Sequence, residues 1–407
     1  MTSSATAIIT NGNGRLSSRA MLAVLAAQFL SALADNALLF AAIALLKSFA
    51  DYQNWYAPML QAFFVLAFII FAPFVGAFAD ALPKGRVMMI SNGLKFIGSA
   101  LMLLGFNPWL AYGLVGLGAA AYSPAKYGIL SQLVPQEKLV KANSLMEGST
   151  IVAILLGALL GGWLADISVH GTLIGISACY VLAALVNAPI PRLPPEHPVG
   201  KLGPRKLVVD FIGALKTLYR NPDARFSLIG TSLFWSSGST LRFLLIAWVP
   251  VALLIDDNKT AANLSGVVAV GIAIGAALAA RFVTLATIRR VLPAGLLLGV
   301  LVMALSQMTG IYGAAILLVA IGACGGMFVV PLNALLQERG HETVGAGHAV
   351  AVQNFSENIA MLLLVGFYTL ITRLGVPVVD SAVGFGALIL SGMAGLAWLR
   401  MKSEKSD

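Results

Sequence analysis

Charged residues are scarce in this sequence. Asp, Glu, Lys and Arg together make up 11% of its 407 residues, whereas a soluble domain carries about 25%. Apolar residues account for 59% of the chain. A water-soluble protein of this length needs more charge to cover its surface, so the composition excludes that class and predicts apolar side chains that face lipid.

Cysteine and histidine are also scarce. The two cysteines, Cys179 and Cys324, lie far apart within apolar runs, and we interpret both as small buried residues without a disulfide. The four histidines form no cluster with metal-ligand spacing. We therefore expect no metal, no cofactor and no enzyme active site, although a membrane enzyme stays one of the classes to test.

The net charge of +9 does not indicate a nucleic-acid-binding protein. The basic residues lie between apolar segments, which is typical of cytoplasmic membrane loops. The first apolar run, 20–46, is too long for the apolar part of a signal peptide and lacks a usual cleavage site. We expect no nucleic-acid partner and no cleaved leader.

Twelve apolar runs are each long enough to cross a bilayer, which takes about 20 residues. The runs are 20–46, 58–80, 86–105, 109–132, 142–165, 170–190, 225–254, 262–281, 291–309, 311–337, 346–372 and 377–400. They predict an all-α integral membrane protein with twelve transmembrane helices. The expected divisions are an N-terminal tail (1–19), a six-helix bundle (20–191), a linker (192–224), a second six-helix bundle (225–400) and a C-terminal tail (401–407).

Lysine and arginine predict the orientation. With both termini inside, only Lys47, Lys259 and Arg373 fall on the outer side, and only Lys95, Lys126 and Arg242 lie within helices. All other basic residues are then cytoplasmic, as the positive-inside rule requires. Within the linker, residues 206–219 place apolar side chains on one helical face and predict a short amphipathic helix at the cytoplasmic surface, with a plain solvated linker as the alternative.

The two halves of the chain resemble each other. The segment from Phe29 to Phe40 matches the segment from Phe234 to Leu245, and the residues around Pro124 match those around Pro331. Both matches are separated by nearly the same length of chain. This predicts a six-plus-six duplication with a pseudo-two-fold relation between the bundles, the usual plan of alternating-access transporters.

The loop after the second run has the sequence GAFADALPKGR. It resembles the loop motif of the major facilitator superfamily, although Asp80 and Gly85 lie farther apart than in that motif. The resemblance implies the major facilitator fold and a cytoplasmic charge latch that stabilises one conformer. The alternative is that these are solvated charges at a helix end. The latch residues are Gly76, Asp80, Lys84, Gly85 and Arg86.

Six charged residues lie in or near helix interiors, where each costs at least about 2.5–3.5 kcal/mol on insertion scales. We expect Asp35 of the first helix and Arg242 of the seventh to face each other across a central cavity, where they bind a zwitterion or form a permanent ion pair. Lys95 lies nearer the cytoplasmic side and can snorkel toward it. The other three are Lys126, Glu147 and Glu357.

The remaining candidates surround these charges. Lys126 follows Pro124 and can contact a phosphate or carboxylate, or pair with Glu147. Glu357 can be a cation site, a proton acceptor or a tie between helices. The full set of candidate substrate-binding residues is Asp35, Asn36, Lys126, Tyr127, Glu147, Arg242, Asn333, Asn354 and Glu357.

Several segments in both halves resemble the bacterial lysophospholipid transporter family. They are 28–40 (QFLSALADNALLF), 119–130 (AAAYSPAKYGIL), 231–235 (TSLFW), 241–245 (LRFLL) and 330–339 (VPLNALLQER). The resemblance places Asp35, Lys126 and Arg242 in a headgroup site. It implies a flippase-type transporter that moves lysophosphatidylethanolamine and related lysolipids from the outer to the inner leaflet of the bacterial inner membrane.

The resemblance also implies phospholipid remodelling, in which an acyltransferase–acyl carrier protein synthetase re-acylates the transported lipid. Some relatives carry a fused acyltransferase domain, but no histidine here is followed by Asp five positions later. We therefore expect no acyl transfer by this chain. We also expect the protein to be a monomer. The alternative function is a proton-coupled drug or metabolite exporter of the same superfamily, with Asp35 or Glu357 carrying the proton.

Overall fold

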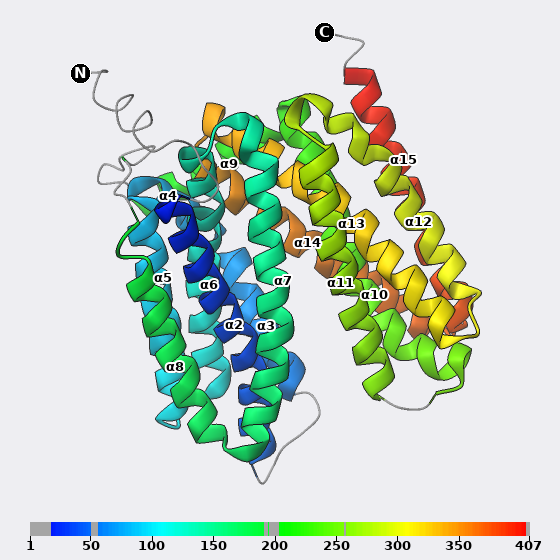
Figure 1. The fold of residues 1–407 in the computed structure, drawn as a ribbon, viewed down its shortest axis with the longest axis horizontal. Helices are drawn as coiled ribbons and strands as arrows, with labels where there is room; N and C mark the ends of the chain where they lie inside the picture. Colours follow the sequence, from blue (N-terminus) through cyan, green and yellow to red (C-terminus); the bar gives the residue numbers. More distant parts are fainter. Residues whose placement is uncertain (1–17, 50–55, 191–193, 195–202, 256–257, 404–407) are drawn as a thin grey trace. The chain divides into compact units, whose positions relative to one another are not determined.

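The computed structural model describes residues 18–49, 56–190, 194, 203–255 and 258–403 (Figure 1). Most of the predicted N-terminal tail, residues 192–193 and 195–202 of the predicted linker, and residues 404–407 of the predicted C-terminal tail lie outside the described residues. Within the described ranges the regular structure is helical throughout. The prediction of an all-α membrane protein is confirmed.

Each of the twelve predicted runs coincides with a helix or with two consecutive helices. The elements are α2 (Arg19–Lys47), α3 (Tyr56–Ile70), α4 (Ala72–Ala81), α5 (Lys84–Leu103), α6 (Pro108–Leu133), α7 (Gln136–Ile167), α8 (Val169–Val186), α9 (Pro204–Arg220), α10 (Pro222–Trp248), the π-helix η1 (Val249–Leu253), α11 (Asn258–Phe282), the 3-10 helix η2 (Leu285–Val291), α12 (Leu292–Ser306), α13 (Ile311–Thr343), α14 (Ala346–Arg373) and α15 (Val378–Ser403).

Nine of the described helices are long and apolar enough to cross a membrane. A tenth span results if α3 and α4, which are bent by 62° at Phe71, count as one. The two remaining predicted runs are α5 and α6. Large apolar side chains are exposed on the outside of the membrane-spanning helices. On α7, for example, Leu159, Trp163 and Ile167 are all more than half exposed. Such a surface is expected against lipid.

Helix boundaries follow local sequence signals. Asn107 caps α6 by accepting hydrogen bonds from the backbone N–H groups of Trp109 and Leu110, and Pro108 occupies the first helical position. Asn221 and Pro222 begin α10 in the same way. An N-terminal proline loses no hydrogen bond because that N–H has no helical partner. These signals start each helix at a defined residue.

The described residues form two compact units. The first consists of the described residues within Met1–Ala142, Val152–Thr217 and Gln337–Phe355, and the second of those within Asn143–Ile151, Leu218–Leu336 and Ser356–Asp407. In the first unit α5 packs on α6 and α8, and α2 packs on α8. In the second α15 packs on α12 and α10. The domain boundaries drawn from the sequence stay a prediction.

Internal prolines occur at matching places in α6 and α13. Pro124 lies inside α6 and Pro331 inside α13, and the polar residues two positions later, Lys126 and Asn333, are both buried. A proline inside a helix removes a backbone hydrogen bond and bends the helix. The internal proline followed by a buried polar residue thus occurs once in each half of the chain, at the positions that the predicted duplication matches.

Candidate functional site

A buried ion pair joins α2 to α5 in the first unit. The Nζ atom of Lys95 lies 2.7 Å from Oδ2 of Asp35, and the lysine side chain is only 2% exposed. The Asp35 side chain is 20% exposed. Lys95 does not snorkel toward the cytoplasmic surface, as its position in the sequence allowed, because a carboxylate holds its ammonium inside the bundle.

Neighbouring polar side chains form further hydrogen bonds with Asp35 and Lys95. The Tyr180 hydroxyl donates to Oδ1 of Asp35 at 2.8 Å. Lys95 also donates to the Ser31 hydroxyl at 2.9 Å, which in turn donates to Oδ1 of Asn92 at 2.8 Å. The Lys95 ammonium lies 4.8 Å from the ring centroid of Tyr122, a cation–π distance. Charges in a low-dielectric interior need this degree of satisfaction.

Glycine makes room for the lysine. A Cβ atom at Gly118 on α6 would lie 2.7 Å from Cγ of Lys95 and 2.8 Å from the Ser91 carbonyl oxygen. Only glycine therefore allows α6 to pack this closely against α5. The sequence signals for the pair were Lys95 and Asp35 themselves, whereas nothing in the sequence identified Ser31, Asn92 or Tyr180 as partners.

A second polar area of the first unit lies along α6. The Lys126 ammonium lies 4.1 Å from the ring centroid of Tyr127, and Lys126 is buried. Asn354, on the part of α14 that belongs to this unit, donates to the Ser123 hydroxyl at 3.0 Å. Asn36 instead bonds back to the Ala32 carbonyl oxygen of its own helix. The structure thus brings Asn354 to the polar turn that precedes Lys126.

Buried polar residues also occur in the second unit. The amide of Asn333 lies 3.5 Å from Oε1 of Glu147, and both side chains are buried. Glu357 and Asn358 are buried on α14. Arg242 is exposed on α10. Asp35 and Arg242 belong to different units, so their predicted meeting across a cavity stays a prediction.

The predicted latch residue Asp80 binds the start of α14. Its carboxylate accepts hydrogen bonds from the backbone N–H groups of Gly347 at 2.8 Å and His348 at 3.0 Å, and it contacts Nδ1 of His348 at 2.6 Å. Lys84 donates to Oδ1 of Asp80 at 2.6 Å. A carboxylate at a helix N-terminus is stabilised by the helix dipole and by the free N–H groups.

Other members of the predicted latch have different surroundings. A Cβ atom at Gly76 would lie 3.0 Å from Cβ of Ala351, so Gly76 allows α4 to approach α14. Gly85 packs in a similar way against Ile190. Arg86 is exposed. His348, which the sequence analysis did not single out, is the additional side chain that contacts Asp80.

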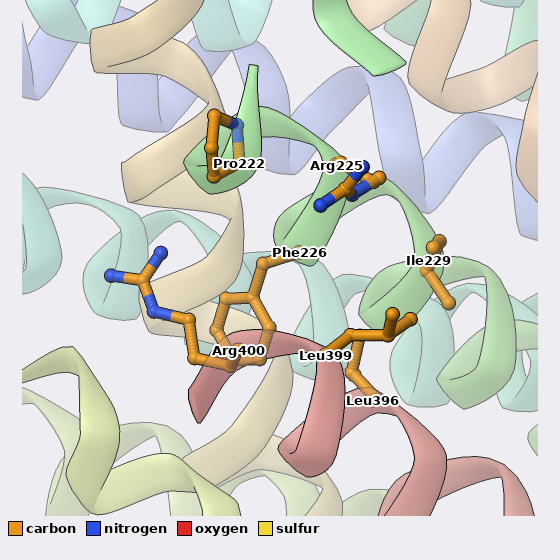
Figure 2. A pocket seen from close by; sticks show the side chains of 7 residues that line it. All are labelled: Pro222, Arg225, Phe226, Ile229, Leu396, Leu399 and Arg400. Carbon is orange, nitrogen blue, oxygen red and sulfur yellow. The ribbon is translucent and has the colours of Figure 1, made fainter. Parts of the chain in front are cut away.

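Cavities in the two units differ in size and lining. An apolar cavity of about 390 Å³ lies between α2, α7 and α8, lined by residues such as Ala37, Leu160 and Ile176. A pocket of only about 10 Å³ lies between α10 and α15 (Figure 2). There Arg400 pairs with Asp223 and lies over the Phe226 ring. The second pocket holds about one water molecule, so it is too small for an organic substrate.

Metal-ligand geometry does not occur in the described part of the chain. No group of three or more His, Cys, Asp or Glu side chains gathers there in a way that holds a metal ion. The chemistry available in the described polar clusters is charge pairing and hydrogen bonding. These groups can bind a charged or zwitterionic headgroup, and they lie within helices that are otherwise apolar.

Solved structures share this fold. The fucose:proton symporter FucP of E. coli superposes with a TM-score of 0.74 at 13% identity, covering 93% of this chain and 98% of that one. The human organic anion transporter MFSD10 gives 0.74 at 17% identity, covering 93% of this chain and 99% of that one. At such low identity the likeness shows the fold alone.

Sequence comparison identifies the family. The model of the Major Facilitator Superfamily matches residues 24–365. The lysophospholipid transporter LplT of Citrobacter koseri is 54% identical over 392 residues, which cover 96% of this chain and 98% of the relative. LplT of Serratia proteamaculans is 57% identical over 358 residues, covering 88% and 90%. The chain therefore belongs to the Major Facilitator Superfamily and, within it, to the lysophospholipid transporter family.

Proposed function

We propose that this protein moves lysophospholipids, chiefly lysophosphatidylethanolamine, from the outer to the inner leaflet of the bacterial inner membrane. Near full-length similarity to relatives named lysophospholipid transporters carries this proposal. The geometry supports it, because a lysolipid needs charged partners for its headgroup and apolar surroundings for its single chain. Buried charges within apolar helices meet both needs.

Asp35 and Lys95 are the proposed centre of headgroup recognition. In the described state each charge neutralises the other at 2.7 Å. A zwitterionic headgroup can replace both partners at once, because its ammonium suits Asp35 and its phosphate suits Lys95. An exchange of this kind leaves no charge unpaired in the bilayer, which keeps the cost of opening the pair low.

The rest of the transport path through the protein is proposed to be lined by polar and charged side chains of both halves. They are Asn36, Lys126, Tyr127, Glu147, Arg242, Asn333, Asn354 and Glu357. Alternating access between the two bundles would expose this path to each side in turn. The Asp80 contacts with the start of α14, with Lys84 beside them, are proposed to hold one conformer. Transport would then require these contacts to open and re-form.

The cellular setting is part of the proposal. Both termini would lie in the cytoplasm, since the basic residues gather on that side, and the protein would act as a monomer. An acyltransferase–acyl carrier protein synthetase would re-acylate the delivered lipid. The chain itself would transport the lipid without catalysing acyl transfer.

Uptake of labelled lysophosphatidylethanolamine by spheroplasts tests the proposal, in cells that lack their own transporter. Arg242→Ala should abolish uptake, whereas Arg281→Ala, at an exposed arginine of α11, should leave it near normal. Near-normal uptake by Arg242→Ala would remove Arg242 from the path. A chain that instead shows efflux driven by a proton gradient, lost in Asp35→Asn, would be an exporter.

A further inference from the structure

The short helix α9 is tied closely to a membrane span. Its last residue, Arg220, is separated from Pro222, the first residue of α10, by Asn221 alone. The segment Pro222–Leu253 is long and apolar enough to cross a membrane. Consecutive Cα atoms are about 3.8 Å apart, so the end of α9 lies within about 8 Å of the first residue of this candidate span.

One face of α9 is covered by protein. Phe211, Ala214 and Leu218 are buried, and the Phe211 ring lies 5.5 Å from the ring of Phe355, centroid to centroid. The Tyr219 hydroxyl donates to the Ser356 hydroxyl at 3.2 Å. The apolar face predicted from the sequence is therefore used for packing against α14 and is not available to lipid.

A different face of α9 is also apolar, and it is exposed. Val208, Val209 and Ile212 are 37%, 58% and 45% exposed. Arg205 and Lys216, both exposed, continue the same stripe, because Arg205, Val208, Ile212 and Lys216 follow one another at intervals of three or four residues. Helices that lie in a membrane interface combine an apolar face with Lys and Arg side chains, and these long side chains can extend to the headgroups beside apolar neighbours.

The charge of α9 indicates which lipid this stripe suits. The helix has four basic residues, Arg205, Lys206, Lys216 and Arg220, and one acidic residue, Asp210. Each basic residue near an anionic membrane surface adds about 1 kcal/mol of attraction. A neutral lipid surface does not supply this attraction.

We propose that the stripe formed by Arg205, Val208, Val209, Ile212 and Lys216 is a docking surface for anionic phospholipid in the membrane that α10 crosses. The three apolar side chains insert below the headgroups, and the basic side chains contact lipid phosphates. Lipid bound here holds α9 against the bilayer at the connection between the two halves of the sequence. The proposal requires that α10 spans the membrane, and it does not depend on which substrate is transported.

Site-directed labelling of the full chain tests this docking surface. In a background with Cys179→Ala and Cys324→Ala, a nitroxide is placed at Ile212→Cys or, as a matched control, at Thr217→Cys, which is exposed on another side of α9. Each protein is reconstituted in nanodiscs of phosphatidylcholine, with or without phosphatidylglycerol. Accessibility to oxygen and to a water-soluble nickel complex is then measured.

The label at position 212 should favour oxygen over the nickel complex only when phosphatidylglycerol is present, and the label at 217 should stay accessible to nickel in both bilayers. Arg205→Gln and Lys216→Gln should each lower the lipid-inserted population about fivefold relative to the aqueous one. Full nickel access at position 212 in the anionic bilayer would overturn the proposal. Equal insertion of the label at position 212 into both bilayers would also overturn the proposal. Protection of this label from nickel only in native membranes would overturn it too, because it would indicate a protein partner.

Discussion

The ammonium of Lys95 and the carboxylate of Asp35 face each other at 2.7 Å, so a lysine of α5 neutralises an acid of α2 inside the first unit. This pair gives the partly buried carboxylate of Asp35 a structural partner within its own unit. Its structural role and its proposed transport role can be separated by mutation, because stability depends on the net neutrality of the pair whereas headgroup binding depends on its charges.

Removing one member of the pair should damage folding. Lys95→Met leaves Asp35 without its counter-charge, which costs about 3–5 kcal/mol. The double variant Asp35→Asn with Lys95→Met should regain most of the lost thermal stability, because it is neutral, while uptake of lysophosphatidylethanolamine stays absent. Thermal unfolding in detergent and spheroplast uptake measure the two effects. A double variant that transports normally would show that the pair has only a structural role.

The hydroxyl of Tyr180 offers a finer test. Tyr180→Phe removes the hydrogen bond to Asp35, and a hydrogen bond to a charged group contributes about 1.5–3 kcal/mol. Tyr122→Phe is the matched control, because it keeps the ring beside Lys95 and removes a hydroxyl that has no hydrogen-bond partner within the described residues. Tyr180→Phe should lower the melting temperature and Tyr122→Phe should not. Equal losses in both variants would argue against a specific Tyr180–Asp35 bond.

Glycine at position 347 is required by the Asp80 contact. A Cβ atom there would lie 2.4 Å from Oδ1 of Asp80, whereas one at Gly366 in the same helix would meet nothing within 4 Å. Gly347→Ala should therefore break the contact between α4 and α14 and reduce uptake severalfold, while Gly366→Ala should transport normally. Cysteine accessibility at the cytoplasmic ends of the helices would report the altered balance of conformers. Unchanged accessibility and uptake in Gly347→Ala would remove this contact from the proposed latch.

Much of the fold follows from the sequence because apolar run length is a strong signal. The bilayer thickness fixes the minimum length of a span, so runs such as 20–46 and 346–372 predict helices close to α2 and α14. The bend between α3 and α4 was not predicted, because no glycine or proline interrupts the run at Phe71 itself and Pro73 falls within the first turn of α4.

The candidate site was less predictable than the fold. A charge within an apolar run signals importance without naming its partner, because pairing depends on helix packing between residues far apart in sequence. Two helices, α3 and α4, lie between Asp35 and Lys95 in the sequence. The absence of a Cβ atom at Gly118 lets α6 approach Lys95 closely. The contact between His348 and Asp80 could not be predicted either, because the two residues are far apart in the sequence and meet only through helix packing.

The burial of Lys95 has a consequence for biosynthesis. The helix α5 is not among the nine described helices that are long and apolar enough to cross a membrane unaided, and a lysine at mid-helix adds about 2.5–3.5 kcal/mol to its insertion cost. Asp35 is synthesised before Lys95 because α2 precedes α5 in the sequence. Its carboxylate can therefore pair with the lysine when α5 inserts into the membrane. We therefore expect α5 to insert less efficiently when Asp35 is replaced by an uncharged residue, so that its insertion depends on the earlier helix α2.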